Sequence, residues 1–364
     1  MAKLNLLVLL GGKSPEHTIS LRSGRNVIDA LNKDKYHILI VGIDKSGVWH
    51  YYSQDQYLDN ADDNIKLTLK ASDTKVFIEG DGKKIYLYNR NDNSKITSVD
   101  VVFPVLHGTY GEDGVLQGML RAVEVPFVGV DLMTSAVGMD KDMSKRLWRD
   151  AGIPIAKFEI AEKHKPKAHK FNDLVKKLSL PIFVKPANAG SSVGVHKVTN
   201  EAEYLVALHD AFLYDRKVLI EEAITGIEVE CAVLGNENPK ASVIGGIRPK
   251  ESFYSYDAKY IQNDGADLMI PAPIETKIAS KIQKLAIKAF KCIGGEGLSR
   301  VDFFLTAKNE IIINEINTLP GFTNISMYPK LWEVSGLSYD ALLDELIKLA
   351  LDRHKAIKKL RVTK

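Results

Sequence analysis

A hairpin near the end of the chain carries the residues with the clearest capacity for chemistry. Its two apolar, β-branched runs flank a polar Lys308-Asn309 turn, and the stretch over 300–321 reads RVDFFLTAKNEIIINEINTLPG. This is the spacing of an antiparallel strand pair. With a two- or four-residue loop, counting outward from the turn places two residue pairs opposite each other on one face: Asp302 with Glu315, and Arg300 with Asn317.

Two carboxylates that face each other repel unless a cation lies between them. Two carboxylates and an amide oxygen are hard ligands suited to Mg²⁺ that is shared with phosphates. We therefore predict a metal site at Asp302, Glu315 and Asn317, which interrupt otherwise apolar strands. The alternative is a hairpin edge whose acids are only solvated.

The N-terminal part must supply a second side of the site. Residues 4–10 (LNLLVLL) and 37–43 (HILIVGI) are typical of buried parallel strands, and a glycine turn after the first leads into a helix. Ligands bind at the carboxyl ends of such strands, where Glu16 and the glycine-rich loop after His107 fall. Each has a plain alternative, since Glu16 could be a solvated acid and His107 a satisfied structural histidine.

A glycine-serine loop follows a strand that bears Lys185. The sequence NAGSSVGV over 188–195 has small residues that let backbone N–H groups approach an anion, and the lysine supplies a point charge for phosphate. The loop therefore favours a flap over a polyphosphate, although a tight turn gives the same pattern and the Walker spacing is absent. The long polar, aromatic-rich segment 249–267 has the character of a lid.

Composition limits the class of protein. The 364 residues carry a net charge of +3, with 45% hydrophobic and 26% charged residues, which is typical of a globular chain of two or three domains. We expect no nucleic-acid partner, because the chain is not strongly basic. We expect no membrane association, because the apolar start is too short for a signal or a span. Cys231 and Cys292 have no metal-ligand spacing, so we expect two buried thiols and a cytoplasmic location. The basic tail over 353–364 is expected to be a solvated end.

Eight motifs, taken together and in order, resemble the D-alanine–D-alanine ligases of the ATP-grasp superfamily. They are GGKSPEHTISLRSG, LHGTYGEDG, MDK, VKPANAGSSVG, EEAITGIEVE, SYDAKY, SRVDFF and NEINTLPGFTNISMYP. The resemblance implies an α/β, three-domain ATP-grasp fold. An N-terminal parallel-sheet domain would span 1–129 with a β-rich insertion near 51–98, followed by a central domain over 130–224 and a C-terminal domain over 225–364. ATP would lie between the last two.

The resemblance also implies roles for individual residues. The nucleotide would be bound by Lys141, Lys185, Ser192, Glu221, Glu222, Ile224, Glu228 and Lys259. Two Mg²⁺ or Mn²⁺ ions would be bound by Asp302, Glu315 and Asn317. Glu16 would receive the ammonium of the first D-alanine, with Ser191 and Tyr260 tying it to the lid. The reacting carbonyl and the second carboxylate would be surrounded by Arg300, the Gly321 N–H and Ser326.

By this resemblance the chain joins two D-alanines through an acyl phosphate, for peptidoglycan precursor synthesis and cell wall biogenesis, and works as a homodimer. Two alternatives stay open: a D-alanine–D-lactate ligase and an ATP-binding regulatory module without catalysis. A regulatory module has no need for Glu16, Arg300 and Ser326 together. Tyr260, where ligases that use D-lactate often have phenylalanine, favours D-alanine as the acceptor.

Overall fold

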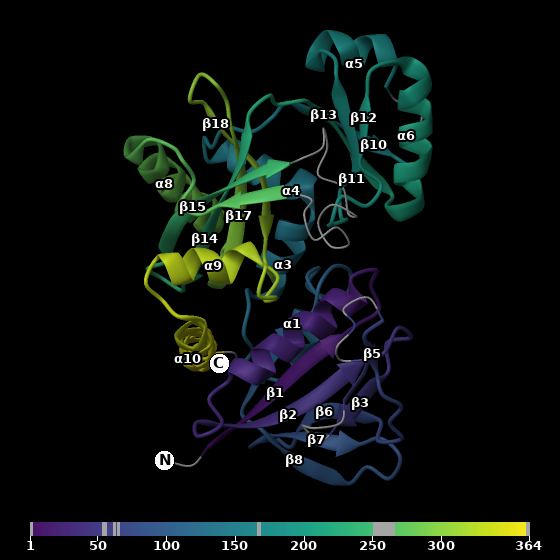
Figure 1. Ribbon diagram of the computed structural model, residues 1–364. Coiled ribbons are helices and arrows are strands. Elements are labelled where there is room, and N and C mark those ends of the chain that lie inside the picture. Colours follow the sequence, from purple (N-terminus) through teal and green to yellow (C-terminus); the bar gives the residue numbers. More distant parts are fainter. Residues whose placement is uncertain are drawn as a thin grey trace.

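The computed structural model describes residues 3–52, 57–60, 63, 66–165, 169–249 and 266–361. Figure 1 shows three α/β units, with the N-terminal unit at the bottom, a small unit at the upper right and a larger unit at the upper left. Most of the segment expected to be a lid lies outside the described residues, and so do Lys259 and Tyr260.

The N-terminal unit is built on a sheet with the strand order β3-β2-β1-β9. β1, β2 and β9 are parallel, as the buried apolar runs predicted, and β3 is an antiparallel edge strand. The elements of this unit are β1 (Leu4–Gly11), α1 (His17–Ala30), β2 (Tyr36–Ile43), β3 (Trp49–Tyr52), β4 (Leu58–Asp59), β5 (Thr68–Leu69), β6 (Val76–Gly80), β7 (Ile85–Asn89), β8 (Lys95–Val99), β9 (Val101–Val105) and α2 (Val115–Ala122).

Both faces of the parallel sheet are covered. Successive residues of a strand point to opposite faces, and Leu7 and Leu9 of β1 share a buried cluster with Ile78 and Leu87 of the separate β6-β7-β8 sheet. The other face of β1 packs against α1 and against the last helix of the chain. The strands within 76–99 therefore complete the core of the N-terminal unit, while the domain limits derived from the sequence stay a prediction.

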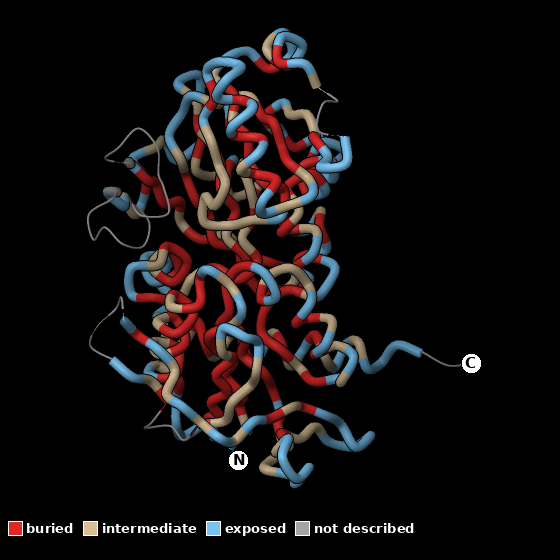
Figure 2. Tube along the Cα trace, turned by 90° about the vertical axis from the view of Figure 1, so that its right-hand side faces the viewer, coloured by how far each residue is buried: buried red, intermediate tan, exposed pale blue. Residues whose placement is uncertain are grey.

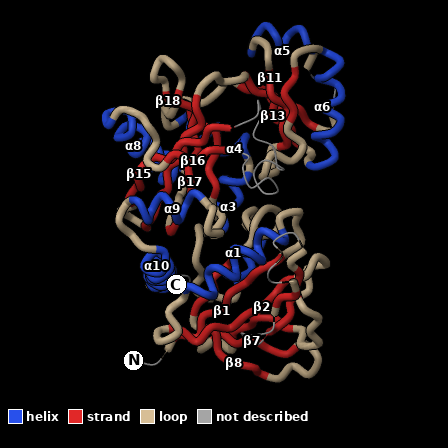
Figure 3. Tube along the Cα trace, viewed as in Figure 1, coloured by secondary structure: helices blue, strands red, loops and turns tan. Residues whose placement is uncertain are grey.

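The central unit contains the antiparallel sheet β10-β13-β11-β12. Helices α5 and α6 bury their apolar residues against this sheet, on the side that faces outward in Figure 3. Helix α4 begins at Asp140, whose side chain accepts hydrogen bonds from two backbone N–H groups and so caps the helix. The elements from 130 onward are α3 (Leu132–Met139), α4 (Lys141–Asp150), β10 (Phe158–Glu162), α5 (Phe171–Leu178), β11 (Ile182–Pro186), β12 (His196–Val198), α6 (Glu201–Tyr214) and β13 (Lys217–Glu222).

The C-terminal unit contains the antiparallel sheet β16-β15-β14-β17-β18. One face packs against the expected apolar stripe of α8, which includes Ile278, Ile282 and Ala286, and the other face packs against α9. The elements of this unit are β14 (Ile227–Gly235), β15 (Lys240–Pro249), β16 (Ala266–Met269), α8 (Thr276–Cys292), β17 (Gly297–Leu305), β18 (Ile311–Asn317), α9 (Met327–Val334) and α10 (Tyr339–Lys358).

The hairpin β17–β18 has the predicted pairing at its functional end. Arg300 lies opposite Asn317 and Asp302 lies opposite Glu315. The predicted two- or four-residue loop is wrong, because Leu305 pairs with Ile311 and leaves the five residues 306–310 in the loop. A β-bulge at Asn314 then shifts the pairing by one residue and restores the expected partners, since a bulge adds one unpaired residue to one strand.

Two further expectations need correction. The basic tail is not wholly a solvated end, because α10 continues to Lys358 and Arg353 is only 5% exposed. The guanidinium of Arg353 donates to the carbonyl oxygens of Gly129 and Phe127 at 2.6 and 2.8 Å, and it lies over the Phe127 ring. Cys231 is buried as expected, but Cys292 is partly exposed because it is the last residue of α8.

The buried segments run through the interior of each unit, as Figure 2 shows, while the last described residues extend away from the body. Among the described helices, none combines the length and the apolar character needed to span a bilayer.

Candidate active site

A single cleft of about 1210 Å³ brings together the residues that the sequence pointed to. Its walls come from all three units: the turn before α1, the loop after β11, the end of β13 and the hairpin β17–β18. Every described residue assigned to the site lines this cleft: Glu16, Lys141, Lys185, Ser191, Ser192, Glu221, Glu222, Ile224, Glu228, Arg300, Asp302, Glu315, Asn317, Gly321 and Ser326. The roles given to these residues stay predictions.

Acidic residues form a row across three neighbouring strands. Glu230 on β14 lies opposite Asp302 on β17, and Asp302 in turn lies opposite Glu315 on β18. We refer to Glu230, Arg300 and Asp302 as the carboxylate cluster. Sequence reasoning missed Glu230, although its position two residues after Glu228 places both acids on one face of a strand.

Arg300 is the cation within this cluster. Its Nε and Nη2 atoms donate to the two carboxylate oxygens of Asp302 at 2.8 and 2.7 Å, and Nε also lies 3.0 Å from Oε2 of Glu230. Burial alone would lower the pKa of Arg300, but Asp302 and Glu230 outweigh burial and raise it. The guanidinium is therefore charged at every relevant pH.

The donor set at the hairpin fits a hard divalent cation. Oδ1 of Asn317 is buried and has no hydrogen-bond partner within the part of the chain that is described. A buried amide oxygen without a partner is unfavourable, and a cation beside Asp302 and Glu315 would satisfy it. No group of three or more His, Cys, Asp or Glu residues suited to a metal occurs among the described residues, and the role of Asn317 as a ligand stays a prediction.

Lysines surround one acid on another side of the cleft. Nζ of Lys145 lies 2.5 Å from Oε1 of Glu221, and Nζ of Lys185 lies 2.5 Å from Oε2 of the same carboxylate. We refer to these three residues as the lysine cluster. Burial would raise the pKa of Glu221, but the two ammonium groups outweigh burial and lower the pKa to about 2. Glu221 is therefore ionised, with one lysine on each oxygen.

Lys145 is a second residue that sequence reasoning missed. Its side chain is 0% exposed, and burial lowers its pKa against the opposing effect of Glu221. A lysine inside a polar helix reads as an exposed residue, yet Lys145 follows Lys141 by four positions. This spacing places two side chains on the same helix face and could have indicated that Lys145 points the same way as Lys141, which lines the cleft.

Lys141 lies between the glycine-serine loop and the acidic row. Its Nζ donates to the carbonyl oxygen of Ala189 at 2.7 Å and lies 3.3 Å from Oε2 of Glu315. The first contact fixes the lysine to the glycine-serine loop, and the second brings it to the acidic row. A group bound between lysines and acids would therefore meet Lys141.

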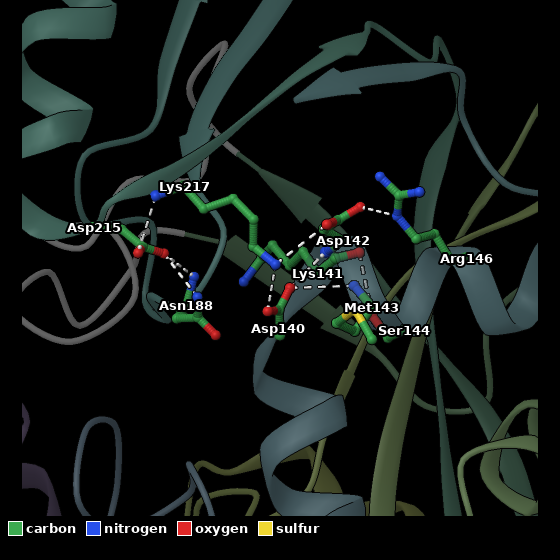
Figure 4. A network of polar contacts seen from close by, with 9 residues as sticks. All are labelled: Asp140, Lys141, Asp142, Met143, Ser144, Arg146, Asn188, Asp215 and Lys217. Carbon is green, nitrogen blue, oxygen red and sulfur yellow. Dashed lines mark hydrogen bonds and ion pairs between the residues drawn. The ribbon is translucent and has the colours of Figure 1, made fainter. Parts of the chain in front are cut away.

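A polar network anchors the loop to the helix that carries Lys141. Figure 4 shows Nζ of Lys217 between Asp140 and Asp142, at 2.5 and 3.2 Å. Asp215 accepts hydrogen bonds from the backbone and side-chain nitrogens of Asn188 at 2.8 and 2.9 Å. Since Lys217 and Asp215 are close in sequence, the network joins the start of the loop to the first turn of α4.

The glycine-serine loop reaches across to the N-terminal unit. Oγ of Ser191 donates to Oε1 of Glu16 at 2.5 Å. Ser191 and Ser192 have φ angles of 52° and 59°, a left-handed conformation that is uncommon for residues other than glycine. Glu16 is buried, so it does not have the environment of a solvated surface acid.

The turn after β18 lies beside the hairpin. A Cβ added at Gly321 would come 2.7 Å from Oγ of Ser326, so a side chain at position 321 would displace Ser326. Oγ of Ser326 accepts from the N–H of Thr323 at 3.0 Å and contacts the Thr323 hydroxyl at 2.7 Å. These contacts fix Ser326 at the edge of the cleft.

His107 has partners on both ring nitrogens. Nδ1 lies 3.2 Å from the carbonyl oxygen of Leu319, and Nε2 lies 3.1 Å from the Ser23 hydroxyl. Burial is the largest single influence and lowers its pKa, but Glu112, Glu16 and the Leu319 carbonyl together outweigh burial, so the pKa is raised. The satisfied structural histidine is thus the alternative that its contacts favour, although His107 also lines the cleft.

Known proteins identify the family. A profile described as D-ala D-ala ligase C-terminus matches residues 147–348, and one described as D-ala D-ala ligase N-terminus matches residues 5–130. The chain is 50% identical to D-alanine–D-alanine ligase A of Salmonella typhimurium over 363 residues, which cover 100% of both chains. The chain belongs to the D-alanine–D-alanine ligase family.

Solved structures of this family share the fold. The D-alanine–D-alanine ligase from Coxiella burnetii has a TM-score of 0.85 at 38% identity and covers 99% of this chain and 97% of its own. The VanG D-Ala:D-Ser ligase from Enterococcus faecalis has a TM-score of 0.83 at 36% identity, covering 96% and 100%. The D-alanine–D-alanine ligase from Bacillus anthracis complexed with ATP has a TM-score of 0.73 at 26% identity, covering 97% and 99%. The expected ATP-grasp fold is thereby confirmed.

Proposed function

We propose that the chain ligates two molecules of D-alanine to D-alanyl-D-alanine and converts ATP to ADP and phosphate. The product would serve peptidoglycan precursor synthesis. Membership of the family supports this reaction. The observation that carries the proposal is the single cleft in which lysines, acids and Glu16 meet across three units, because both substrates and ATP must be held together for group transfer.

The chain's own residues supply charge and orientation. In the first step the D-alanine carboxylate attacks the γ-phosphorus of ATP, and Lys141 and Lys185 neutralise charge on the transferred group. Asp302, Glu315 and Asn317 would hold two Mg²⁺ or Mn²⁺ ions, which would supply further neutralisation of the phosphates. Glu16 would accept the ammonium of the same D-alanine through a charge-assisted hydrogen bond.

The second step forms the peptide bond. The amine of the second D-alanine attacks the acyl phosphate, the C–N bond forms and phosphate leaves with the electron pair of the C–O bond. Arg300 and the Gly321 N–H would stabilise the oxyanion of the tetrahedral intermediate, and Ser326 would bind the carboxylate of the attacking D-alanine. The glycine-serine loop, which already contacts Glu16 through Ser191, would exclude water from the acyl phosphate.

Release of ADP tests this function directly. We expect ADP release to require added D-alanine and a divalent cation, with D-alanyl-D-alanine as the main product when D-alanine, D-lactate and D-serine are all present. ADP release that is independent of D-alanine, or binding of ATP without turnover, would favour a regulatory module. Substantial D-alanyl-D-lactate or D-alanyl-D-serine would assign a different acceptor.

A homodimer in the cytoplasm completes the proposal. Large exposed apolar side chains gather on the neighbouring helices α2 and α3, namely Val115, Met119, Leu132 and Met133. Exposed apolar patches of this kind mark interaction surfaces, and we assign this one to a second copy of the chain. Light scattering should give twice the monomer mass, and Met133→Lys should lower it; a monomer at micromolar concentration would contradict the assignment. The use of ATP supports the cytoplasmic location.

A further inference from the structure

Arg300 has more acidic partners than its charge requires. Asp302 contacts it with both carboxylate oxygens, and Glu230 lies 3.0 Å from Nε. Glu230 is only 6% exposed. Burying a carboxylate is unfavourable unless a specific contact compensates, so this third acid of the row needs an explanation.

The proposed reaction gives Asp302 two cationic groups to balance. Both of its oxygens contact the guanidinium in this structure, whereas a divalent cation at the hairpin needs at least one of them. Each carboxylate oxygen has two lone pairs, so Asp302 can contact both groups, but Arg300 and the cation then share its one negative charge. Leaving a buried guanidinium without a counter-ion is strongly unfavourable, and arginine cannot escape by losing its proton.

Glu230 is placed to remove this conflict. It lies on β14, on the other side of Asp302 from Glu315 in the acidic row, and it contacts Nε of Arg300. We propose that Glu230 is a positioning residue that retains Arg300 beside the reacting carbonyl when Asp302 also binds the divalent cation. This inference rests on the proposed metal-dependent ligation, and it assigns Glu230 to Arg300 and not to the metal.

Removal of the Glu230 charge should therefore weaken metal binding indirectly. In Glu230→Gln, Arg300 keeps only Asp302 as a full counter-ion and competes with the cation for it. We expect Mn²⁺ to bind about 10-fold more weakly, within the range found when partners behind a metal ligand are removed. The kcat for ligation should fall because Arg300 is held less firmly, while the KM for ATP should change little.

The decisive measurement needs no turnover. Binding of Mn²⁺ is followed by electron paramagnetic resonance with a non-hydrolysable ATP analogue and without D-alanine. Glu310→Gln, which removes an acid from the tip of the same hairpin, is the matched control and should bind Mn²⁺ like the unmodified protein. Equal Mn²⁺ affinity in Glu230→Gln and the unmodified protein would overturn the inference. If the unmodified protein itself does not bind Mn²⁺, the proposed metal site fails instead.

A second pair of variants separates positioning from direct ligation and from folding. In the Arg300→Met background there is no guanidinium to hold, so adding Glu230→Gln should leave Mn²⁺ affinity unchanged. A further loss of affinity in that double variant would make Glu230 a metal ligand and overturn the proposal. Replacing a buried ion pair by uncharged groups is usually tolerated, so this comparison stays available if Glu230→Gln alone does not fold.

Discussion

The lysine cluster and the carboxylate cluster are opposite in charge but alike in construction. In the first, Lys145 and Lys185 share the single acid Glu221; in the second, Glu230 and Asp302 share the single cation Arg300. Counting only these ion pairs, the first cluster has an excess of positive charge and the second an excess of negative charge. An anionic phosphate and a divalent cation are the ligands that would balance them, so each cluster is completed by its ligand.

Lys141 sets the relation between the two clusters. It belongs to the helix that carries Lys145, yet its nearest acid is Glu315 in the acidic row. A nucleotide whose phosphates also bind a divalent cation would lie along this connection. The comparison predicts that damage on the acidic side affects the chemical step, and damage on the lysine side affects ATP binding.

Glu315→Gln should have the largest effect. The substitution keeps the shape of the side chain but removes one charge from the acidic row, so phosphoryl transfer loses electrostatic stabilisation. We expect kcat to fall at least ~10²-fold, the scale found when one preorganised electrostatic group is removed. Steady-state kinetics at saturating Mg²⁺ measure this, with circular dichroism as the control for folding. Normal turnover in a folded variant would contradict the metal assignment.

Lys185→Ala should weaken the lysine cluster. Glu221 keeps Lys145 as a partner, so the fold should survive, while the phosphates lose a charge-assisted contact. We expect the KM for ATP to rise ~10-fold or more, because a hydrogen bond to a charged group contributes about 1.5–3 kcal/mol. If the KM for ATP equals that of the unmodified protein, the glycine-serine loop is only a tight turn and does not bind phosphate.

Glu16→Gln supplies a control outside both clusters. The first D-alanine would lose a charged acceptor for its ammonium group, so we expect the KM of the tighter D-alanine site to rise about 10-fold. ATP binding should be nearly unchanged, since Glu16 contacts Ser191 and belongs to neither cluster. Equal weakening of ATP and of both D-alanine sites would indicate a general effect on folding.

The smallest expected effect is on the stability of the protein at acid pH, which should depend on the lysine cluster. The pKa of Glu221 falls from its ordinary 4.5 to about 2 on folding. The stabilisation is therefore complete above the ordinary value and is lost as the pH drops from 4.5 towards 2. Urea unfolding between pH 6 and pH 3 should show a steeper loss in the unmodified protein than in Glu221→Gln. Parallel pH profiles would mean that the pKa of Glu221 does not change on folding.

The hairpin shows how far sequence alone could lead. Alternation along strands predicted that Asp302 faces Glu315, and the structure confirms this pairing. The loop length was wrong, and the bulge at Asn314 offset the error. A bulge changes the backbone at one residue without a strong signature in the side chain. Counting residues outward from the turn could therefore predict the paired residues, but not the loop length or the bulge.

Sequence analysis missed Glu230 and Lys145, because their surroundings depend on contacts between segments that are distant in the chain. Glu230 lies opposite Asp302 because of the register in which β14 pairs with β17. The register of two strands that lie far apart in the chain cannot be read from the sequence. Lys145 is fully buried, with its ammonium group against Glu221 of β13, while its local sequence is that of an exposed helix. The fold class followed from apolar periodicity and the family resemblance, which report local structure and ancestry rather than these contacts.

The position of helix α10 affects the order in which the parts of the protein can fold. Its residues Leu342, Leu346 and Ile347 share one buried cluster with Leu6 and Val8 of β1, and Arg353 joins it to Phe127 and Gly129. Strand β1 is thus synthesised long before α10, which together with α1 covers one of its faces. The N-terminal sheet can complete its native packing only after α10 is synthesised, and a chain that stops before α10 would leave part of that face open to aggregation.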